Sequence, residues 1–141
     1  GEIMEMEEII ERYICKPCRV AIAGASTKPD RPVYGVMEYL GQNGFTMFPV
    51  NPACEGDEIQ GLVCAGSILD LKESFDVLAL FISPKRQQPV LEELVQLDHK
   101  PVVWMQPGAE NDDAEEDLKS KGYEVVKSAC MMMVHQVYCG D

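Results

Sequence analysis

Short apolar runs alternate along this chain with segments in which apolar residues recur at every third or fourth position. Such runs are typical of buried strands, and a spacing of i, i+3, i+4 and i+7, as in residues 33–40, is typical of a helix that covers a sheet. The pattern predicts strands at 19–24, 45–50, 77–82, 102–105 and 123–126, and helices at 2–14, 33–40, 86–97 and 112–121. It also predicts a short edge strand at 61–65 and a short helix at 67–73, and it assigns no element from Cys130 onward.

The order of these elements predicts the fold. Strands that alternate with helices form a mostly parallel sheet with helices on both faces, which is an α/β fold of three layers. Because crossovers between parallel strands are right-handed, we expect the first strand to be central. A chain of 141 residues suits one domain. We expect an N-terminal helix in residues 1–18 to pack on a domain of residues 19–141.

Charge and composition narrow the function. The net charge of −12 repels nucleic acid and the anionic surface of a membrane, so we expect neither as a partner. No apolar run approaches the roughly 18 residues of a membrane-spanning helix, and no secretory signal is visible. We therefore expect a cytoplasmic protein whose six cysteines are free thiols in a reducing compartment.

The loops that follow the strands are where a ligand is expected, because sheets of this class bind ligands outside the carboxyl ends of their strands. The loop after the first predicted strand offers a turn at Gly24, two hydroxyls, and the cations Lys28 and Arg31. The helix that follows points its N-terminal N–H groups at the same place. Lys85 and Arg86 follow the third of the longer strands, so four of the twelve basic residues fall in two loops. These loops predict a nucleotide-binding pocket for a phosphorylated ligand.

Two common nucleotide-binding motifs are absent. The chain has no G-x-x-x-x-G-K-[ST] sequence, which argues against a nucleoside triphosphatase. It also has no G-x-G-x-x-G sequence, since the next glycine after Gly24 is Gly35. The second predicted strand is followed by Asn51, where an NAD enzyme usually has an acid for the ribose hydroxyls. We therefore do not expect an NAD dehydrogenase.

The same loops resemble those of a known family. The segments VAIAGAS at 20–26, PDRP at 29–32, YG at 34–35, PVNP at 49–52, DV at 76–77 and WMQPG at 104–108 occur in this order. Together they resemble the small stand-alone CoA-binding domain proteins, which are similar to the CoA-binding domain of succinyl-CoA synthetase. The resemblance covers about residues 19–130. It implies a Rossmann-like fold that binds coenzyme A, or an acyl-CoA, at the strand-end loops.

The resemblance also implies a role for individual residues. Residues 24–26 would face the pyrophosphate with Arg31 beside them, residues 51–52 would line the nucleotide side, residues 83–84 would form a neighbouring wall, and residues 106–108 would line the path of the pantetheine arm. The expected cofactor-binding residues are Gly24, Ala25, Ser26, Lys28, Arg31, Tyr34, Asn51, Pro52, Ser83, Pro84, Gln106, Pro107 and Gly108. The acyl group, and the choice between CoA and another nucleotide with a pyrophosphate, stay open.

Two other classes of function stay open beside this one. A CoA-dependent transferase or thiol-handling enzyme would use Cys130 or His135, and a regulatory or adapter protein would bind a partner through its acidic surface. We favour binding without catalysis, because no nucleophile–base pair is recognisable. The C-x-x-C sequence from Cys15 to Cys18 lies at a helix end before a strand, the reverse of a redox-active pair, so we interpret it as chance spacing. We expect no metal site, and a homodimer through the methionines at 131–133 stays open.

Overall fold

Five strands form one sheet at the centre of the structure. The computed structural model describes residues 4–140. The strands are β1 (Arg19–Ala23), β2 (Thr46–Val50), β5 (Val77–Leu80), β6 (Val102–Met105) and β7 (Val125–Lys127). They lie in the order β2-β1-β5-β6-β7, and every neighbouring pair is parallel. A separate antiparallel hairpin of β3 (Glu58–Ile59) and β4 (Leu62–Val63) contacts β2.

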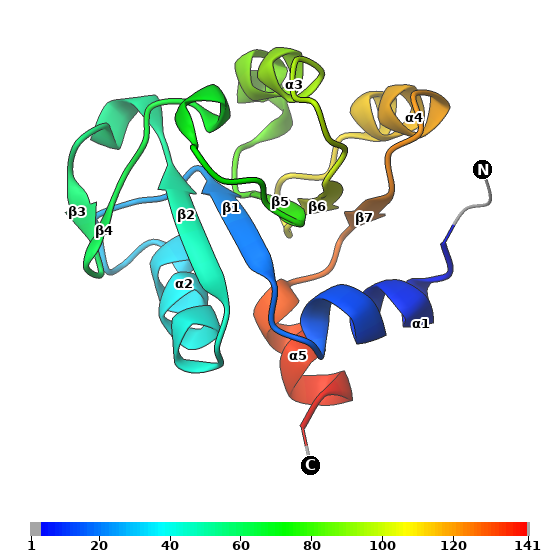
Figure 1. The fold of residues 1–141 in the computed structure, drawn as a ribbon, viewed down its shortest axis with the longest axis horizontal. Coiled ribbons are helices and arrows are strands. Elements are labelled where there is room, and N and C mark those ends of the chain that lie inside the picture. The colour runs from blue at the N-terminus through cyan, green and yellow to red at the C-terminus, as the bar shows by residue number, and fades with distance from the viewer. Residues whose placement is uncertain (1–3, 141) are drawn as a thin grey trace.

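Helices cover both faces of this sheet, which confirms the predicted three-layer α/β fold. The helices are α1 (Met6–Ile9), α2 (Pro32–Gln42), α3 (Gln88–Leu94), α4 (Asp112–Ser120) and α5 (Met131–Tyr138). Figure 1 shows α3 and α4 on one face, and α1, α2 and α5 on the other. Along β1, Val20 and Ile22 join the core under α1, α2 and α5, whereas Ala21 and Ala23 join the core under α3 and α4. Burial on both faces explains why the strands appear in the sequence as continuous apolar runs.

The N-terminal helix packs on the domain. It begins at α1 and continues as one π-helical turn, Ile10–Ile14. Ile9, Ile10 and Ile14 are buried in the same core as β1 and α2. The predicted helix started at residue 2, but residues 1–3 lie outside the described part of the chain.

Several predicted elements differ from the observed ones. The middle strand is β5, and β1 lies one place away from it, between β2 and β5. The predicted helix at 67–73 is only a 3-10 turn, Ile68–Asp70, because a segment this short forms too few helical hydrogen bonds to persist. The predicted helix at 86–97 is divided into a 3-10 turn at Pro84–Arg86 and the shorter α3, in which Pro89 occupies the first turn. The predicted edge strand at 61–65 is the short β4 followed by a bridge from Ala65 to Val50.

Helix α5 was not predicted. It buries Met131 and Val134, one turn apart, against the sheet. With only two buried positions in eight residues, its spacing is too short to separate a helix from a strand by pattern alone. Among residues 4–140, no helix has the length and apolar character needed to cross a membrane.

The expectation that all six cysteines are free is wrong. Cys15 and Cys139 form a disulfide with their Cα atoms 5.1 Å apart. The other cysteines, Cys18, Cys54, Cys64 and Cys130, are free thiols. The pairing arises because α5 places the end of the chain beside the end of the N-terminal helix, and 124 residues separate the two cysteines in the sequence. Such a pairing depends on tertiary structure, so cysteine spacing alone could not reveal it.

Candidate functional site

A cleft of about 1100 Å³ opens at the carboxyl ends of the strands. The chain passes from β1 to β2 on one side and later to β5 on the other side of β1, so the loops after β1 and β5 diverge. Such a switch point is where α/β sheets commonly bind ligands. The loops after β1, β2, β5 and β6 line the cleft together with the starts of α2 and α3.

Gly24 brings two of these loops close together. Its φ of +93° lies in the left-handed region, and its N–H donates to the carbonyl oxygen of Val50 at 2.9 Å. A Cβ at this position would lie 2.8 Å from the carbonyl oxygen of Phe81. Only glycine therefore lets the backbone after β1 pass this close to the backbone after β5. The wall of the cleft at this point is main chain, which is suited to close contact with a ligand.

Asn51 fixes the loop after β2 against the loop after β1. Its Nδ2 donates to the carbonyl oxygen of Ala25 at 2.8 Å, and its Oδ1 accepts from the N–H of Ala53 at 2.9 Å. Both ends of the amide are therefore used within the protein. Asn51 lines the cleft and also holds its shape.

On the other side of the cleft, Gln87 fixes the loop after β5 against the loop after β6. Its side chain is fully buried, and its Nε2 donates to the carbonyl oxygens of Ile82 at 2.8 Å and Ala109 at 2.7 Å. Its Oε1 accepts from Nδ2 of Asn111, the residue that caps α4. These bonds tie the loop after β5 to the loop after β6. The sequence analysis missed Gln87, because nothing in the sequence separates it from the exposed Gln88 that follows.

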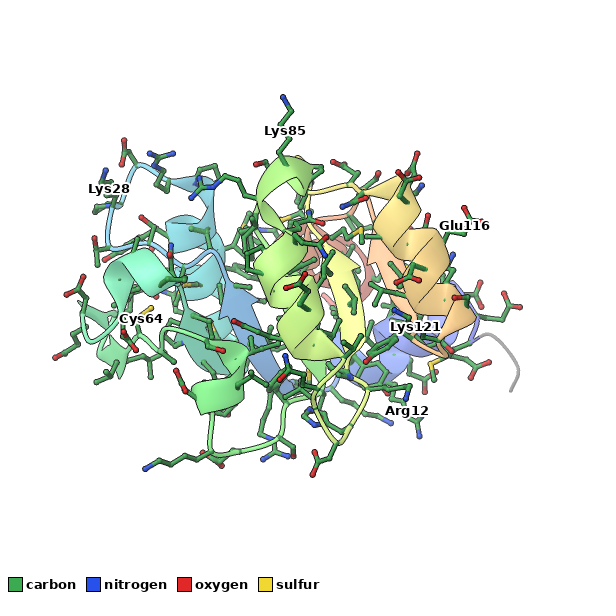
Figure 2. All side chains as sticks on the ribbon, turned by 90° about the horizontal axis from the view of Figure 1, so that it is seen from above. Arg12, Lys28, Cys64, Lys85, Glu116 and Lys121 are labelled. Carbon is green, nitrogen blue, oxygen red and sulfur yellow. A yellow bond between two sulfur atoms is a disulfide. The ribbon has the colours of Figure 1, made fainter. Side chains whose placement is uncertain are left out.

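Four exposed cations, Lys28, Arg31, Lys85 and Arg86, line the cleft. Within the described part of the chain none of the four forms an ion pair, whereas the lysines at the end of α4 pair with acids of their own helix. Figure 2 shows Lys28 and Lys85 at the same edge of the molecule, and Arg12 toward the opposite edge. The charges of this cation group are therefore available to a ligand.

The start of α2 adds to the positive potential of the cleft. Its first turn has no acidic residue, whereas the first turn of α4 has three. The partial positive charge of the α2 N-terminus is therefore not compensated by its own helix, and Pro32 and Val33 place it at the cleft. The acids Asp57 and Glu93 also line the cleft, but the four cations outnumber them. The local charge is positive in a chain whose net charge is −12.

The structure brings together ten of the thirteen residues expected to bind a cofactor. Tyr34, Pro84 and Gln106 do not line the cleft. Gln106 is buried, and its Oε1 accepts from the N–H of Met131 at the start of α5. The ten residues that line the cleft are Gly24, Ala25, Ser26, Lys28, Arg31, Asn51, Pro52, Ser83, Pro107 and Gly108.

The two residues weighed as reactive groups, Cys130 and His135, also lie outside the cleft lining. Nδ1 of His135 is 2.7 Å from the hydroxyl of Tyr39, and its ring packs edge-on to Phe45. Cys130 is the residue that precedes α5. The geometry gives neither a place beside a ligand in the cleft. No group of three or more metal-ligating side chains occurs among residues 4–140.

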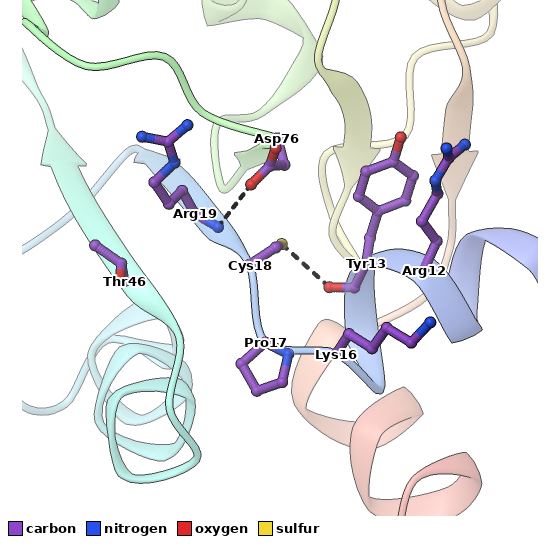
Figure 3. Close-up of a pocket in the computed structure, with 8 residues that line it drawn as sticks. All are labelled: Arg12, Tyr13, Lys16, Pro17, Cys18, Arg19, Thr46 and Asp76. Atoms are coloured by element: carbon purple, nitrogen blue, oxygen red, sulfur yellow. Dashed lines mark hydrogen bonds between the residues drawn. The ribbon is translucent and has the colours of Figure 1, made fainter.

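A second hollow of about 560 Å³ lies at the opposite end of the sheet, between the N-terminal helix and the starts of β1 and β2 (Figure 3). Cys18 lines it, and its thiol donates to the carbonyl oxygen of Tyr13 at 3.1 Å. Burial and the nearby Asp76 raise the pKa of the Cys18 thiol to about 12. Cys18 is therefore protonated at neutral pH, and its neighbour in the C-x-x-C sequence, Cys15, is paired with Cys139 instead.

A family model described as a CoA binding domain matches residues 18–136. This range contains every strand of the five-stranded sheet and leaves out only residues 1–17 and 137–141 of the chain. This chain belongs to the CoA-binding domain family. The resemblance found in the sequence is thereby confirmed.

Relatives of this family member differ in size. This chain is 32% identical over 133 residues to the uncharacterized protein YneT of Bacillus subtilis, and the matched region covers 94% of this chain and 93% of YneT. It is 34% identical over 115 residues to the ADP-forming acetate–CoA ligase II of Archaeoglobus fulgidus, but it spans only 16% of that ligase. A solved structure from Thermus thermophilus is 35% identical and superposes with a TM-score of 0.86, covering 94% of this chain and 98% of the other. The domain therefore occurs both as a small protein and as a part of large ligases.

Proposed function

We propose that this protein binds coenzyme A or an acyl-CoA in the cleft at the switch point and does not itself catalyse a reaction on it. The observation that carries the proposal is the cation group, Lys28, Arg31, Lys85 and Arg86, which forms no ion pair among residues 4–140 and lines one cleft together with the start of α2. Coenzyme A carries a pyrophosphate and a 3′-phosphate, and these groups need a helix N-terminus and a few cations. Membership of a CoA-binding domain family supports the proposal.

The residues of the cleft fit such a ligand. Gly24 leaves backbone without a side chain at the wall, and Arg31 stands at the start of α2 beside it. Gly108 has a φ of +93°, and no atom lies within 4 Å of where its Cβ would be, so this loop is open toward a ligand. In this proposal the pantetheine arm passes Pro107 and Gly108, whereas Gln106 supports the loop from behind through α5.

Isothermal titration calorimetry with CoA, acetyl-CoA, NAD and ADP tests the proposal. We expect CoA to bind with micromolar affinity and Arg31→Ala to weaken binding at least tenfold, about 1.4 kcal/mol. Arg12→Ala is the matched control, because it removes the same charge from a side chain whose only aromatic or charged contact among the described residues is its own neighbour Tyr13. Equal binding by NAD would redirect the proposal to another nucleotide, and no binding by any of the four would refute it.

The absence of catalysis needs its own measurement. Acetyl-CoA incubated with the protein is expected to remain intact, because neither Cys130 nor His135 lines the cleft and no histidine among residues 4–140 lines it beside the free thiol that does, Cys54. Chromatography of the mixture and a thiol assay follow its fate. Release of free CoA that Cys130→Ser or His135→Ala abolishes would overturn this half of the proposal.

A further inference from the structure

The end of the N-terminal helix and the end of α5 meet on the face covered by α1, α2 and α5. Cys15 follows the π-helical turn, Cys139 follows α5, and their Sγ atoms are bonded. Both cysteines are half-buried, so neither is sealed in the core. Reduction of the folded protein requires that a thiol in solution reaches this disulfide while the domain stays folded.

The disulfide is the main attachment of the last turn of α5. Met131 and Val134, which pack against the core, lie in the first half of the helix. Val137 and Tyr138 in the last turn are 70% and 65% exposed. The hydrogen bond between Tyr39 and His135 holds the middle of the helix. Beyond this point the covalent link to Cys15 is what keeps the end of α5 in place.

The first turn of α5 contacts a loop of the cleft. Oε1 of Gln106 accepts from the N–H of Met131 at 3.3 Å, and Nε2 of Gln106 is buried with no hydrogen-bond partner among the described residues. Among the described residues, the side-chain hydrogen bond of Gln106 is therefore made to α5. Its neighbours Pro107 and Gly108 line the cleft. Helix α5 therefore contacts this loop through its first turn, and the disulfide holds its last turn.

Cys18 does not compete for this disulfide. It is three residues from Cys15, but its buried thiol is protonated at neutral pH and donates to Tyr13. The thiolate is the species that attacks a disulfide, so internal exchange through Cys18 is suppressed. Opening of the Cys15–Cys139 bond is therefore assigned to a thiol from outside the protein and not to Cys18.

We propose that the Cys15–Cys139 disulfide is a redox-sensitive clasp, which in its oxidised form fixes α5 and the 106–108 loop and whose reduction loosens both and weakens ligand binding at the cleft. The part that concerns the ligand rests on the proposed function. In the reduction, a cellular dithiol gives two electrons and two protons to Cys15 and Cys139, which become thiols, and is itself oxidised to a disulfide. The step needs no other reactant.

The test compares oxidised wild type, wild type reduced with dithiothreitol, and Cys139→Ser. We expect dithiothreitol to release two thiols from the folded protein. In both forms that lack the disulfide we expect faster amide hydrogen exchange in residues 135–140 and 106–109. We also expect both to bind acetyl-CoA at least threefold more weakly. Acetyl-CoA is the ligand used because it has no free thiol to react with the disulfide. Cys18→Ser is the matched control. It keeps the disulfide and is expected to behave like oxidised wild type.

The measurements separate this inference from the proposed function. If acetyl-CoA binds neither form but exchange at 106–109 still responds to reduction, the clasp stands and the proposed function fails. If exchange at 106–109 is the same in all forms, the clasp is refuted whatever binds. Appearance of the two thiols only after denaturation refutes it equally, because the bond is then not accessible in the folded state.

Discussion

A substitution at Gly24 tests whether the backbone wall of the cleft is as tight as the structure indicates. Alanine there keeps a φ of +93°, which costs about 1–3 kcal/mol for a residue with a side chain. Its Cβ would also lie 2.8 Å from the oxygen of Phe81 and 3.0 Å from Cγ1 of Ile82. Relief of that overlap separates the loops after β1 and β5 and costs about 1–3 kcal/mol more. The reduced freedom of the unfolded chain returns about 0.4–1 kcal/mol.

The expected loss for Gly24→Ala is therefore about 2–5 kcal/mol of the free energy of unfolding, a large share of the roughly 5–15 kcal/mol of a typical domain. Substitutions at two further glycines separate the cost of the backbone conformation from the cost of the steric overlap. Gly108→Ala has the same φ but open space, so only the backbone strain less the unfolded-chain term is expected, a net loss of about 1–2 kcal/mol. Gly35→Ala lies within α2 with no atom near, and is expected to be neutral or stabilising by up to about 1 kcal/mol.

Urea denaturation followed by circular dichroism gives the three free energies. A loss at Gly24 no larger than the loss at Gly108 would show that the contact with Phe81 is not limiting, and the reasoning about the wall would be wrong. If the reasoning holds, a Gly24→Ala protein that remains folded should bind acetyl-CoA at least tenfold more weakly, while Gly35→Ala binds like wild type.

Two other side chains give predictions about stability. Gln87→Ala leaves the buried carbonyl oxygen of Ala109 and the half-buried one of Ile82 without their donor and should lower the free energy of unfolding by about 2–4 kcal/mol. The exposed neighbour Gln88→Ala should stay within about 0.5 kcal/mol in the same denaturation assay. The hydrogen bond and charge of Lys127 lower the pKa of Asp112, so ionised Asp112 adds stability above its unfolded pKa of about 3.9, and this contribution is lost as pH falls through the lower folded value. Lys127→Met should therefore reduce the fall in the thermal midpoint between pH 6 and pH 3, and an unchanged fall would contradict the pairing.

The sequence predicts those parts of the fold in which the local conformation or burial of a position restricts which residue types can occupy it. Buried strands must be apolar on both faces, so β1, β5 and β6 are visible as runs without any knowledge of the fold. Gly24 is predictable for the same reason, since a sharp turn after a strand with close backbone contact tolerates nothing else. The cation group is visible because cations are rare in this chain and two loops hold four of them.

The features that the sequence did not predict depend on the direction in which a side chain points and on contacts with residues far away in the sequence. Gln106 lies beside two residues that line the cleft, but its side chain points to α5, an element that the sequence did not reveal. Gln87 is polar and lies among exposed residues, yet it is fully buried because two loops far apart in the sequence both need its amide. The Cys15–Cys139 pair likewise exists only once α5 has returned to the N-terminal helix. In each case the contact partner, and not the residue type, decides the role.

Salt dependence decides whether the cation group or the net charge of the protein governs binding of an anionic ligand. With a net charge of −12, long-range electrostatics repel coenzyme A, whereas Lys28, Arg31, Lys85 and Arg86 attract it at short range. The Debye length is about 10 Å at 0.1 M salt and about 3 Å at 1 M, so above 0.1 M distant charges are screened and added salt mainly weakens the contacts within the cleft. We expect the affinity for acetyl-CoA to fall as salt rises from 0.1 to 0.5 M, and to fall less steeply in Arg31→Ala. An affinity that rises over this range would mean that the ligand feels the acidic surface more than the cations of the cleft, and the proposed site would be wrong.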